Sequence, residues 1–570
     1  MTETRSFDQM VLDAMVLHEG GLAEWLLILP ISICFIFASI LLMMRRQMAW
    51  HAPVAVVGLS LLLVNAVALL VYVATYGPIS MAMGGWRPPF GISFTADLTS
   101  ALFLTVSSFV GLACGIYAVA SIDAEERRYG FYPFLFIMIA GVCGSFLTGD
   151  VFNLYVWFEV MLIGSFGLLI LGSEREQLDG ATKYCFLNFI AATIFLLTVA
   201  YVYGVFGTLN MADIAVKSAA LEGEGALQTI AVLFLISFSM KAAAFPLNFW
   251  LPASYHTPRF VVSALFAGLL TKVGIYAMLR IVLMLFPPER EGLGLVIAWM
   301  AALTMMVGAL GALAQTDIRR LLNYLVIAGI GTILAGFAVP PLLEGESAAI
   351  VTGAASVVGE DTRTLAQRIS NLAAQGTLAT GLAGSIFYAL HSIVVMTALY
   401  LATGVAAFRN GSSSLHEMGG MWRRHPLFSA LFLVLLFSVS GLPPFSGFWP
   451  KMLLVRSTLA ADLPWLAFAV LFSGLLITIA AVRVFALGFW RPLPALSRAN
   501  DPVEAKAIAE DTFRAPPPGR PLALVPLVGL AAFVVLVGLF PQWLATLTFR
   551  AANELLMPSA YLASVLGSAP

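Results

Sequence analysis

Long apolar runs recur along almost the whole chain, from Trp25 to the region near Leu544. Each run is long enough to cross the hydrocarbon core of a bilayer, which takes about 20 residues of α-helix. Only 11% of the 570 residues are charged and 60% are hydrophobic, whereas soluble domains carry about 25% charged residues. These runs exclude a soluble fold and predict an all-α polytopic membrane protein.

The positions of the runs predict about 14 transmembrane helices. The expected spans are 23–44, 52–76, 95–120, 131–148, 150–172, 182–206, 227–250, 260–285, 293–314, 320–340, 378–407, 427–453, 463–488 and 521–547. Lys and Arg are concentrated in alternate loops, a bias typical of the cytoplasmic side. We therefore expect a multi-pass protein of the inner (plasma) membrane with both termini on the outer side.

The segments outside the spans suggest no separate soluble domain. Residues 1–130 are expected to hold the first three helices, and residues 521–570 the last helix and a tail. Residues 341–376 are rich in small residues and contain a helical pattern, so we expect an outer-side loop with a surface helix. Residues 489–520 combine charges with the run APPPGRP, which is typical of a linker, here on the cytoplasmic side.

The sequence shows no pattern for a bound cofactor. Cys34, Cys114, Cys143 and Cys185 lie singly in apolar runs, without metal or disulfide spacing. Histidines are not paired on one span as haem ligands would be, and a glycine-rich nucleotide loop is missing. We expect no cofactor, no metal and no enzyme activity of the chain alone. The net charge of −1 indicates no particular partner, and we expect no nucleic acid.

Two apolar stretches carry proline where a continuous helix would be expected. FSMKAAAFPLNFW starts at Phe238 and contains Lys241; FSVSGLPPFSGFW starts at Phe437 and is followed by Lys451. Proline removes a backbone donor and clashes with the carbonyl four residues back. Backbone freed at membrane depth is tolerated only where it is buried in protein or lines a wet cavity. We predict two broken helices, a plan that recurs in secondary transporters.

Ionisable residues within the spans are the candidates for function. The clearest carboxylate is Glu159, and the cations left in the spans are Lys241, Lys272, Arg280, Lys451 and Arg483. An ionised group at mid-membrane costs about 2.5–3.5 kcal/mol, so such groups tend to persist where they pair, line water or move ions. Glu159 is either a proton-binding carboxylate or half of a structural ion pair, and Lys241 is either a titrating group or part of a structural kink.

Two histidines and two arginines have less definite roles. His391 lies in an apolar run, where a packing role and a proton-relay role are both open. Arg280 is expected to be structural, and Arg483 and His256 are expected to be structural or peripheral.

Several stretches together resemble the antiporter-like subunits shared by respiratory complex I, membrane-bound hydrogenases and Mrp-type multisubunit monovalent cation/proton antiporters. They are GDVFNLYVWFEVMLI, KAAAFPLNFWLPASYHTP, VSALFAGLLTKVGIYA, TDIRRLLNYLVI and SGLPPFSGFWPK. Within this family, GGWRPPFGISFTADLTSALF and FNLYVWFEV are most similar to the D-type subunits of the Mrp antiporters.

The resemblance implies a fold with two inverted five-helix repeats, over residues 131–285 and 293–488. It implies proton transfer along Glu159, Lys241, Lys272, His391 and Lys451. It also implies other membrane subunits of an antiporter complex as partners, with protons and Na⁺ or another monovalent cation as the transported ions, in a lipid bilayer.

Two positions depart from the family pattern. Met396 stands where many relatives have lysine, and Ala328-Gly329 stand where relatives often have polar residues. Methionine cannot bind a proton, so the central relay needs water or another residue. Two alternatives stay open: a proton-pumping subunit of a complex I-like NADH:quinone oxidoreductase or hydrogenase, and a scaffold that does not conduct.

Overall fold

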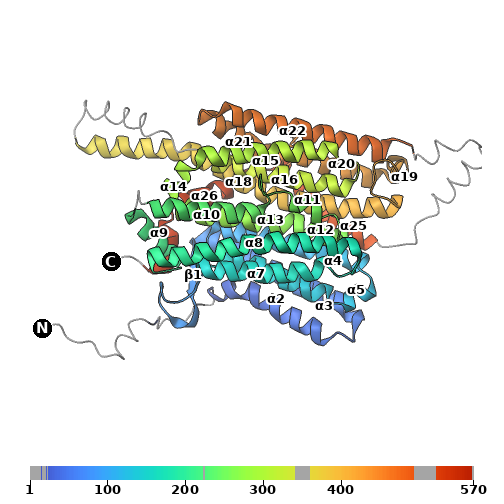
Figure 1. Cartoon of the computed structure of the whole chain (residues 1–570), viewed down its shortest axis with the longest axis horizontal. Coiled ribbons are helices and arrows are strands. Elements are labelled where there is room, and N and C mark those ends of the chain that lie inside the picture. The colour runs from blue at the N-terminus through green and yellow to red at the C-terminus, as the bar shows by residue number, and fades with distance from the viewer. Residues whose placement is uncertain are drawn as a thin grey trace, which may run out of the picture.

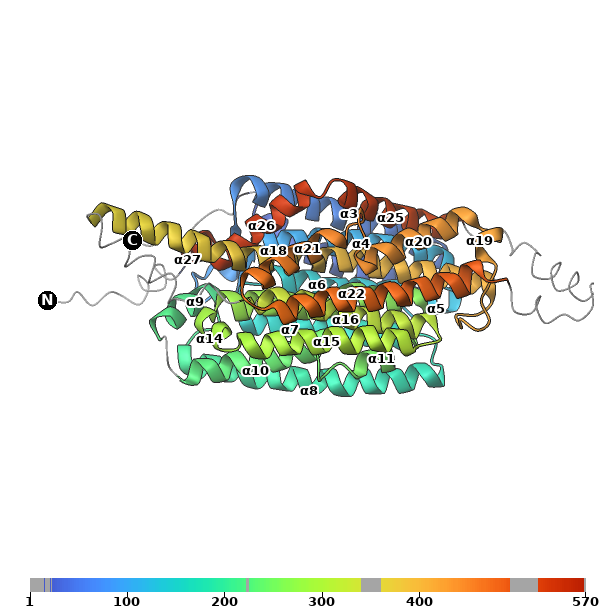
Figure 2. The ribbon, with the colours of Figure 1, turned by 90° about the horizontal axis from the view of Figure 1, so that it is seen from above.

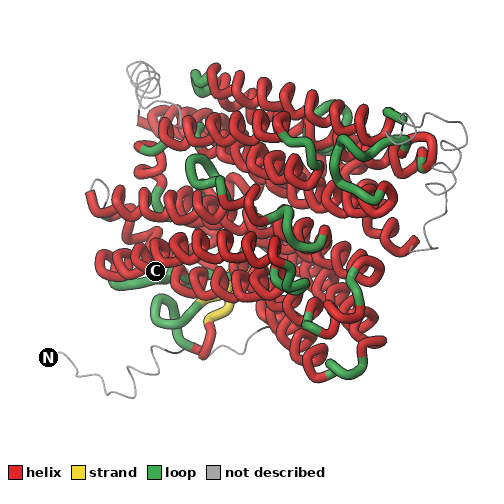
Figure 3. Tube along the Cα trace, turned by 45° about the vertical axis from the view of Figure 1, so that its right-hand side comes forward, coloured by secondary structure: helices red, strands yellow, loops and turns green. Residues whose placement is uncertain are grey.

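The computed structural model describes residues 23–221, 225–339, 360–492 and 521–567, together with Met15 and Gly21. In this part of the chain the regular structure is helical apart from one antiparallel pair of strands, β1 (Ile79–Ala82) and β2 (Ser93–Ala96) (Figure 3, yellow). The long helices lie side by side along one direction (Figures 1 and 2). Their ends gather at two opposite ends of the molecule.

We name these two ends by the short helices that they carry. The α9 end holds α9 (Met211–Ala220), α14 (Pro287–Gly292) and the β1–β2 pair, and the α19 end holds α5 (Ala124–Arg128) and α19 (Met421–Arg424) (Figure 1).

Eleven helices in the described residues are long and apolar enough to cross a membrane. They are α2 (Trp25–Met43), α3 (Met48–Tyr76), α4 (Leu98–Ser121), α7 (Val151–Leu169), α8 (Arg175–Phe206), α10 (Gly225–Ala242), the run from α12 to η3 (Phe260–Leu283), α15 (Gly294–Ala314), α16 (Ile318–Phe337), Gly376–Asn410 of α18, and α22 with η4 (Pro464–Trp490). The multi-pass helical fold is confirmed.

Three further apolar segments decide how many spans are counted. The bent pair α25 (Leu524–Leu539) and α26 (Gln542–Leu556) adds a twelfth if it is one span, while α6 (Phe131–Leu147) and α20 (Pro426–Ser440) are shorter apolar helices. The count of 14 stays a prediction.

The last predicted span, 521–547, is not one straight helix. α25 and α26 meet at 82°, because Pro541 between them lacks the backbone donor that would continue α25. A final helix, α27 (Ser559–Leu566), follows α26.

The predicted loop 341–376 also differs where it is described. From Glu360 onward it is the first part of the continuous helix α18 (Glu360–Asn410), which projects from the α9 end (Figure 1), and not a separate surface helix. Residues 340–359 of that loop, and residues 493–520 of the predicted linker, lie outside the described residues.

Both predicted helix breaks are present. α10 ends at Ala242 before the short α11 (Trp250–Ser254), and α20 ends at Ser440 before α21 (Phe448–Ala460). A side chain beyond each break reaches back to a carbonyl before it. The Trp250 Nε1 donates to the Met240 carbonyl at 3.0 Å, and the Lys451 Nζ donates to the Ser440 carbonyl at 2.8 Å.

The helix pairs α6–α7 and α15–α16 pack through equivalent glycines. A Cβ on Gly141 would lie 2.4 Å from the Met161 nitrogen, and a Cβ on Gly308 would lie 2.3 Å from the Ala328 nitrogen. Both residues of the second contact follow those of the first by the same 167 residues (308 − 141 and 328 − 161). Small residues let the backbones of membrane helices approach closely, so the two crossings have the same geometry.

The N-cap aspartates of α7 and α16, Asp150 and Asp317, are also 167 residues apart (317 − 150). Asp150 accepts from the Asn153 backbone N–H, and Asp317 from that of Arg320. Asp150 bridges to Asn210, which caps α9, whereas Asp317 bridges to Ser414 in the loop before α19. The two pairs therefore start from opposite ends of the bundle (Figure 1) and run in opposite directions.

Candidate functional site

Lys241 lies in the last turn of α10, directly before the first break. It is 4% exposed, and its Nζ donates to the Asn188 carbonyl of α8 at 3.4 Å and lies 5.4 Å from the ring centroid of Phe158 on α7. These contacts come from two helices that face α10. In the described residues no carboxylate forms an ion pair with this ammonium.

Glu159 follows Phe158 on α7, the residue whose ring lies beside the Lys241 ammonium. The two groups are not joined by an ion pair within 4.0 Å, and one oxygen of Glu159, Oε1, is buried without a hydrogen-bond partner. A buried polar atom without a partner is costly, so this carboxylate is suited to taking up a proton or a water molecule. The structure therefore brings Lys241 next to the helix turn that carries Glu159, without an ion pair between the two.

Lys272 is fully buried on α13 (Thr271–Met278), which follows a π-helical turn, η2 (Phe266–Leu270). Its Nζ donates to the Ala267 carbonyl of that turn at 2.7 Å, its one hydrogen bond in the described residues. Gly274 packs against the backbone of Ala242, so α13 crosses α10 at the first break. π-Helical turns are frequent at functional sites.

His391 on α18 is linked to both sides of the second break. Its Nδ1 hydrogen-bonds with the Ser446 hydroxyl at 2.8 Å, and Ser446 in turn hydrogen-bonds with Ser438 at 3.0 Å. The other ring nitrogen, Nε2, is buried without a partner. A free nitrogen beside a hydroxyl pair is the arrangement that a proton relay needs.

Lys451 lies beyond the second break and is 8% exposed. Besides its bond to the Ser440 carbonyl, its Nζ lies 6.0 Å from the ring centroid of Tyr388. The ring of Tyr388 in turn lies 5.6 Å from that of His391. Lys451 and His391 are therefore both neighbours of Tyr388 at the second break, as Glu159 and Lys241 are both next to Phe158 at the first.

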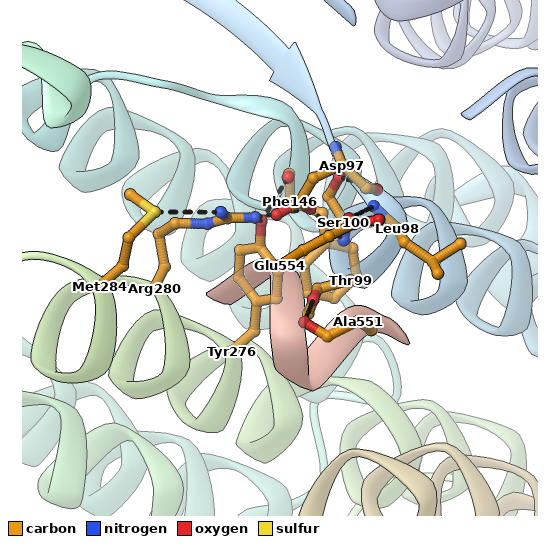
Figure 4. A network of polar contacts seen from close by, with 10 residues as sticks. All are labelled: Asp97, Leu98, Thr99, Ser100, Phe146, Tyr276, Arg280, Met284, Ala551 and Glu554. Carbon is orange, nitrogen blue, oxygen red and sulfur yellow. Dashed lines mark hydrogen bonds and ion pairs between the residues drawn. The ribbon is translucent and has the colours of Figure 1, made fainter. Parts of the chain in front are cut away.

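Arg280 differs from these lysines because its guanidinium group bonds to several side chains, one of them a carboxylate (Figure 4). It is 2% exposed, and its Nη2 lies 2.8 Å from Asp97 Oδ1 and 3.0 Å from the Tyr276 hydroxyl. Burial alone would raise the pKa of the Asp97 carboxyl, but the charge of Arg280 and its hydrogen bond outweigh burial and hold that pKa below its usual value. The structural role expected for Arg280 agrees with this geometry.

The same network holds the C-terminal helices against α4. Glu554 of α26 accepts from the Leu98 backbone N–H at 3.0 Å, and the Thr99 hydroxyl points to the Ala551 carbonyl at 3.5 Å (Figure 4). Sequence patterns did not predict this cluster. The one local signal was Asp97 three residues before Ser100, since these residues form a capping box at the start of α4.

Two other sequence expectations concern side chains near the site. Arg483 is half-buried and donates to the carbonyls of Leu313 and Gln315, as a structural residue would. Met396 is 1% exposed on α18. A Cβ on Gly329 would lie 3.6 Å from the Ser392 hydroxyl and 3.8 Å from the Tyr388 hydroxyl, so hydroxyl groups of α18 adjoin this position of α16.

Comparison with known proteins shows the family of the chain. The family described as "NADH:quinone oxidoreductase/Mrp antiporter, TM" matches residues 148–356 and 368–477. The D subunit of a Na(+)/H(+) antiporter from Alkalihalophilus pseudofirmus is 36% identical over 545 residues, which cover 95% of this chain and 99% of that protein. The chain belongs to the NADH:quinone oxidoreductase/Mrp antiporter membrane family.

Other members of this family are similar over nearly the whole length. The D subunit of the Na(+)/H(+) antiporter of Bacillus subtilis is 32% identical over 539 residues, covering 95% of this chain and 99% of that protein. A chain in the structure of the Mrp complex from Dietzia sp. DQ12-45-1b has a TM-score of 0.79 at 28% identity and covers 96% of this chain and 100% of that chain.

Respiratory complexes share the fold at lower identity. A chain of the archaeal membrane-bound sulfane sulfur reductase has a TM-score of 0.76 at 23% identity and covers 95% of this chain and 99% of that chain. A chain of Thermus thermophilus complex I has a TM-score of 0.65 at 22% identity and covers 91% of this chain and 98% of that chain.

Proposed function

We propose that this chain is a proton-conducting membrane subunit of a multisubunit Na⁺/H⁺ antiporter. Protons move along Glu159, Lys241, Lys272, His391 and Lys451. The observation that carries the proposal is that the lysines and His391 are buried, and Glu159 half-buried, without being held in ion pairs: each lysine ammonium bonds to one backbone carbonyl, and the Glu159 and His391 side chains each keep a buried atom without a partner in the described residues.

In this scheme protonation of Glu159 removes the charge that favours the ammonium of Lys241. Lys241 then releases its proton toward Lys272, His391 and Lys451. Removing one partner of a buried charge pair costs about 3–5 kcal/mol, and one charge moved through 100 mV of membrane potential is worth about 2.3 kcal/mol. The two energies are of similar size, so the membrane potential and an ion gradient together are sufficient to drive the step.

The membrane arrangement is part of the same proposal. It has 14 spans, two inverted five-helix repeats over residues 131–285 and 293–488, and both termini on the outer side of the plasma membrane. The opposed α6–α7 and α15–α16 pairs with their constant shift support the inverted repeats. Partner subunits of the antiporter complex and a monovalent cation complete the assembly.

The test is ion exchange by the intact antiporter complex in everted membrane vesicles. Glu159→Gln and Lys241→Ala are each expected to lower Na⁺-dependent collapse of a pH gradient at least tenfold, the scale on which a positioned proton-transfer group acts. Lys217→Ala is the matched control, because Lys217 is a half-buried lysine of α9 whose ammonium pairs with Asp213 at 2.9 Å, away from the proposed path.

Three outcomes would contradict the proposal. If both variants keep full exchange, the chain does not conduct through these residues and acts as a scaffold. If Lys217→Ala loses as much as Lys241→Ala, the loss does not report on the buried group. If the pH gradient responds to NADH and never to Na⁺, the chain belongs to a redox-driven pump.

A further inference from the structure

A cavity of about 860 Å³ opens at the α19 end of the bundle beside the first helix break. Its lining combines charged residues at the start of α8 with residues in and next to α11; it consists of Arg175, Glu176, Asp179, Lys183, Phe249, Pro252, Ala253, His256, Thr257, Gln315, Arg320 and Tyr324. The five residues of the proposed proton path are not among them. The cavity is therefore a separate site that reaches the same broken helix from one side.

One face of α8 leads from this cavity to Lys241. Gly180, Tyr184 and Asn188 follow one another at one-turn spacing, about 6 Å apart along the helix axis. A Cβ on Gly180 would lie 2.6 Å from the Thr257 hydroxyl of the cavity wall. At the other end of this face, the Asn188 carbonyl accepts from Lys241.

Tyr184, on this face of α8, packs against a second buried tyrosine, Tyr255, which precedes the lining residue His256 in the chain. The rings of Tyr184 and Tyr255 lie 6.5 Å apart, and both residues are almost completely buried. The Tyr184 hydroxyl hydrogen-bonds with Ser165 of α7 at 3.0 Å, whereas the Tyr255 hydroxyl has no partner in the described residues. A buried hydroxyl without a partner is a favourable position for a water molecule, so this layer can be wetted from the cavity.

His256 is the histidine of the cavity lining, and it follows Tyr255 in the chain. Its Nδ1 bonds to the Pro252 carbonyl at 2.9 Å, and its Nε2 lies 3.4 Å from Arg320. Partial burial and the charges of Arg320 and Arg319 lower the pKa of His256 from its usual value. The hydrogen bond to the Pro252 carbonyl and the charge of Asp317 oppose this shift without cancelling it. A histidine that is mostly neutral at neutral pH can accept a proton from cavity water and release it again.

We propose that protons reach Lys241 from this cavity, with His256 as the group that exchanges protons with cavity water and the hydroxyls of Tyr255 and Tyr184 as the relay. Each hydroxyl oxygen accepts one proton and releases its own to the next acceptor, so no tyrosinate is left behind. The inference rests on the proposed function because Lys241 is its end point.

The first test asks whether water fills the cavity and does not depend on transport. Ala253→Cys is placed in a Cys185→Ser background, because Cys185 is the exposed native cysteine among the described residues. A charged, membrane-impermeant thiol reagent is expected to label it from one face of the membrane only. Ala231→Cys, at a fully buried position of α10, is the unlabelled control. Labelling from neither face, as lipid filling the cavity would give, overturns the inference.

The second test asks whether the hydroxyls carry protons. Tyr184→Phe and Tyr255→Phe keep the ring and are each expected to lower exchange roughly tenfold, with cavity labelling unchanged. Tyr132→Phe is the control, since Tyr132 is equally buried and its hydroxyl also lacks a partner in the described residues. Full exchange in both relay variants overturns the relay, and so does a change in cavity labelling, which would reveal a structural effect.

The third test is the pH profile of exchange. His256→Gln is expected to remove an inflection below the ordinary histidine pKa of about 6.5, and an unchanged profile overturns the role of His256. These results separate the two proposals. Loss in Lys241→Ala with full exchange in the relay variants refutes the relay alone, whereas full exchange in Lys241→Ala refutes the proposed function while the labelling result stands.

Discussion

The helix pairs α6–α7 and α15–α16 have the same packing but different chemistry. Gly141 against Met161 and Gly308 against Ala328 make the same close crossing. At the constant shift of 167 residues, however, the position of Glu159 corresponds to Val326, which is fully buried. Backbone packing and the placement of ionisable groups are therefore separate requirements in this fold.

The two helix breaks differ in the same way. In the first, Lys241 precedes the break and Trp250 closes it from beyond; in the second, Lys451 lies beyond the break and itself bonds to the Ser440 carbonyl. One lysine therefore faces a carboxylate helix and the other caps a helix end. The two halves of the bundle are alike in backbone and unlike in the use of their lysines.

The largest expected effect is on packing and is the same in both halves. Gly141→Val and Gly308→Val each put a side chain where a Cβ alone would lie within 2.4 Å of the facing backbone. Overpacking of this kind costs about 1–3 kcal/mol and occasionally more, and here we expect about 3 kcal/mol or more. Thermal unfolding of the purified complex measures it. A large loss in one variant and none in the other would break the likeness between the two pairs.

The second prediction concerns the N-cap of α7. Burial raises the pKa of Asp150 to about 6. The folded state then binds the proton more tightly than the unfolded chain, so the free energy of unfolding falls as pH rises from about 4 to about 6, by roughly 2–3 kcal/mol. Asp150→Asn keeps a capping side chain and is expected to flatten this part of the pH profile. An identical profile for variant and wild type would show that Asp150 keeps its ordinary pKa.

The third prediction separates the two matched positions on α7 and α16. Glu159→Gln is expected to lower exchange at least tenfold, while Val326→Thr, which has nearly the same shape, leaves it within a factor of about two. Vesicle assays normalised to the amount of complex measure both. Equal losses would mean that α16 carries a function that Val326 supports.

The smallest effect is expected at the first break. Trp250→Phe removes the donor to the Met240 carbonyl, which costs about 1 kcal/mol because the carbonyl stays buried. The midpoint of thermal unfolding measures this loss. Leu251→Met, a swap of similar volume at the next, fully buried position, is the control that should cost less.

Much of the fold could be predicted because local sequence patterns determine it. Apolar runs determined that the chain is a multi-pass helical membrane protein, and Pro246 and Pro443 marked the two breaks. The residues Glu159, Lys241, Lys272, His391 and Lys451 were picked out because a charge inside an apolar run is visible without any tertiary information. Their role as a proton path stays a prediction.

Only the tertiary structure decided which buried charges are paired. Arg280 and Lys272 lie on one helical run and look alike in sequence, yet Arg280 meets Asp97 from a distant part of the chain whereas Lys272 meets one carbonyl. The sequence shows which charges lie in the middle of an apolar run, and a charge at that depth in the membrane is costly. Whether the charge is neutralised or left able to exchange protons depends on groups from other helices, which only folding brings within hydrogen-bond distance.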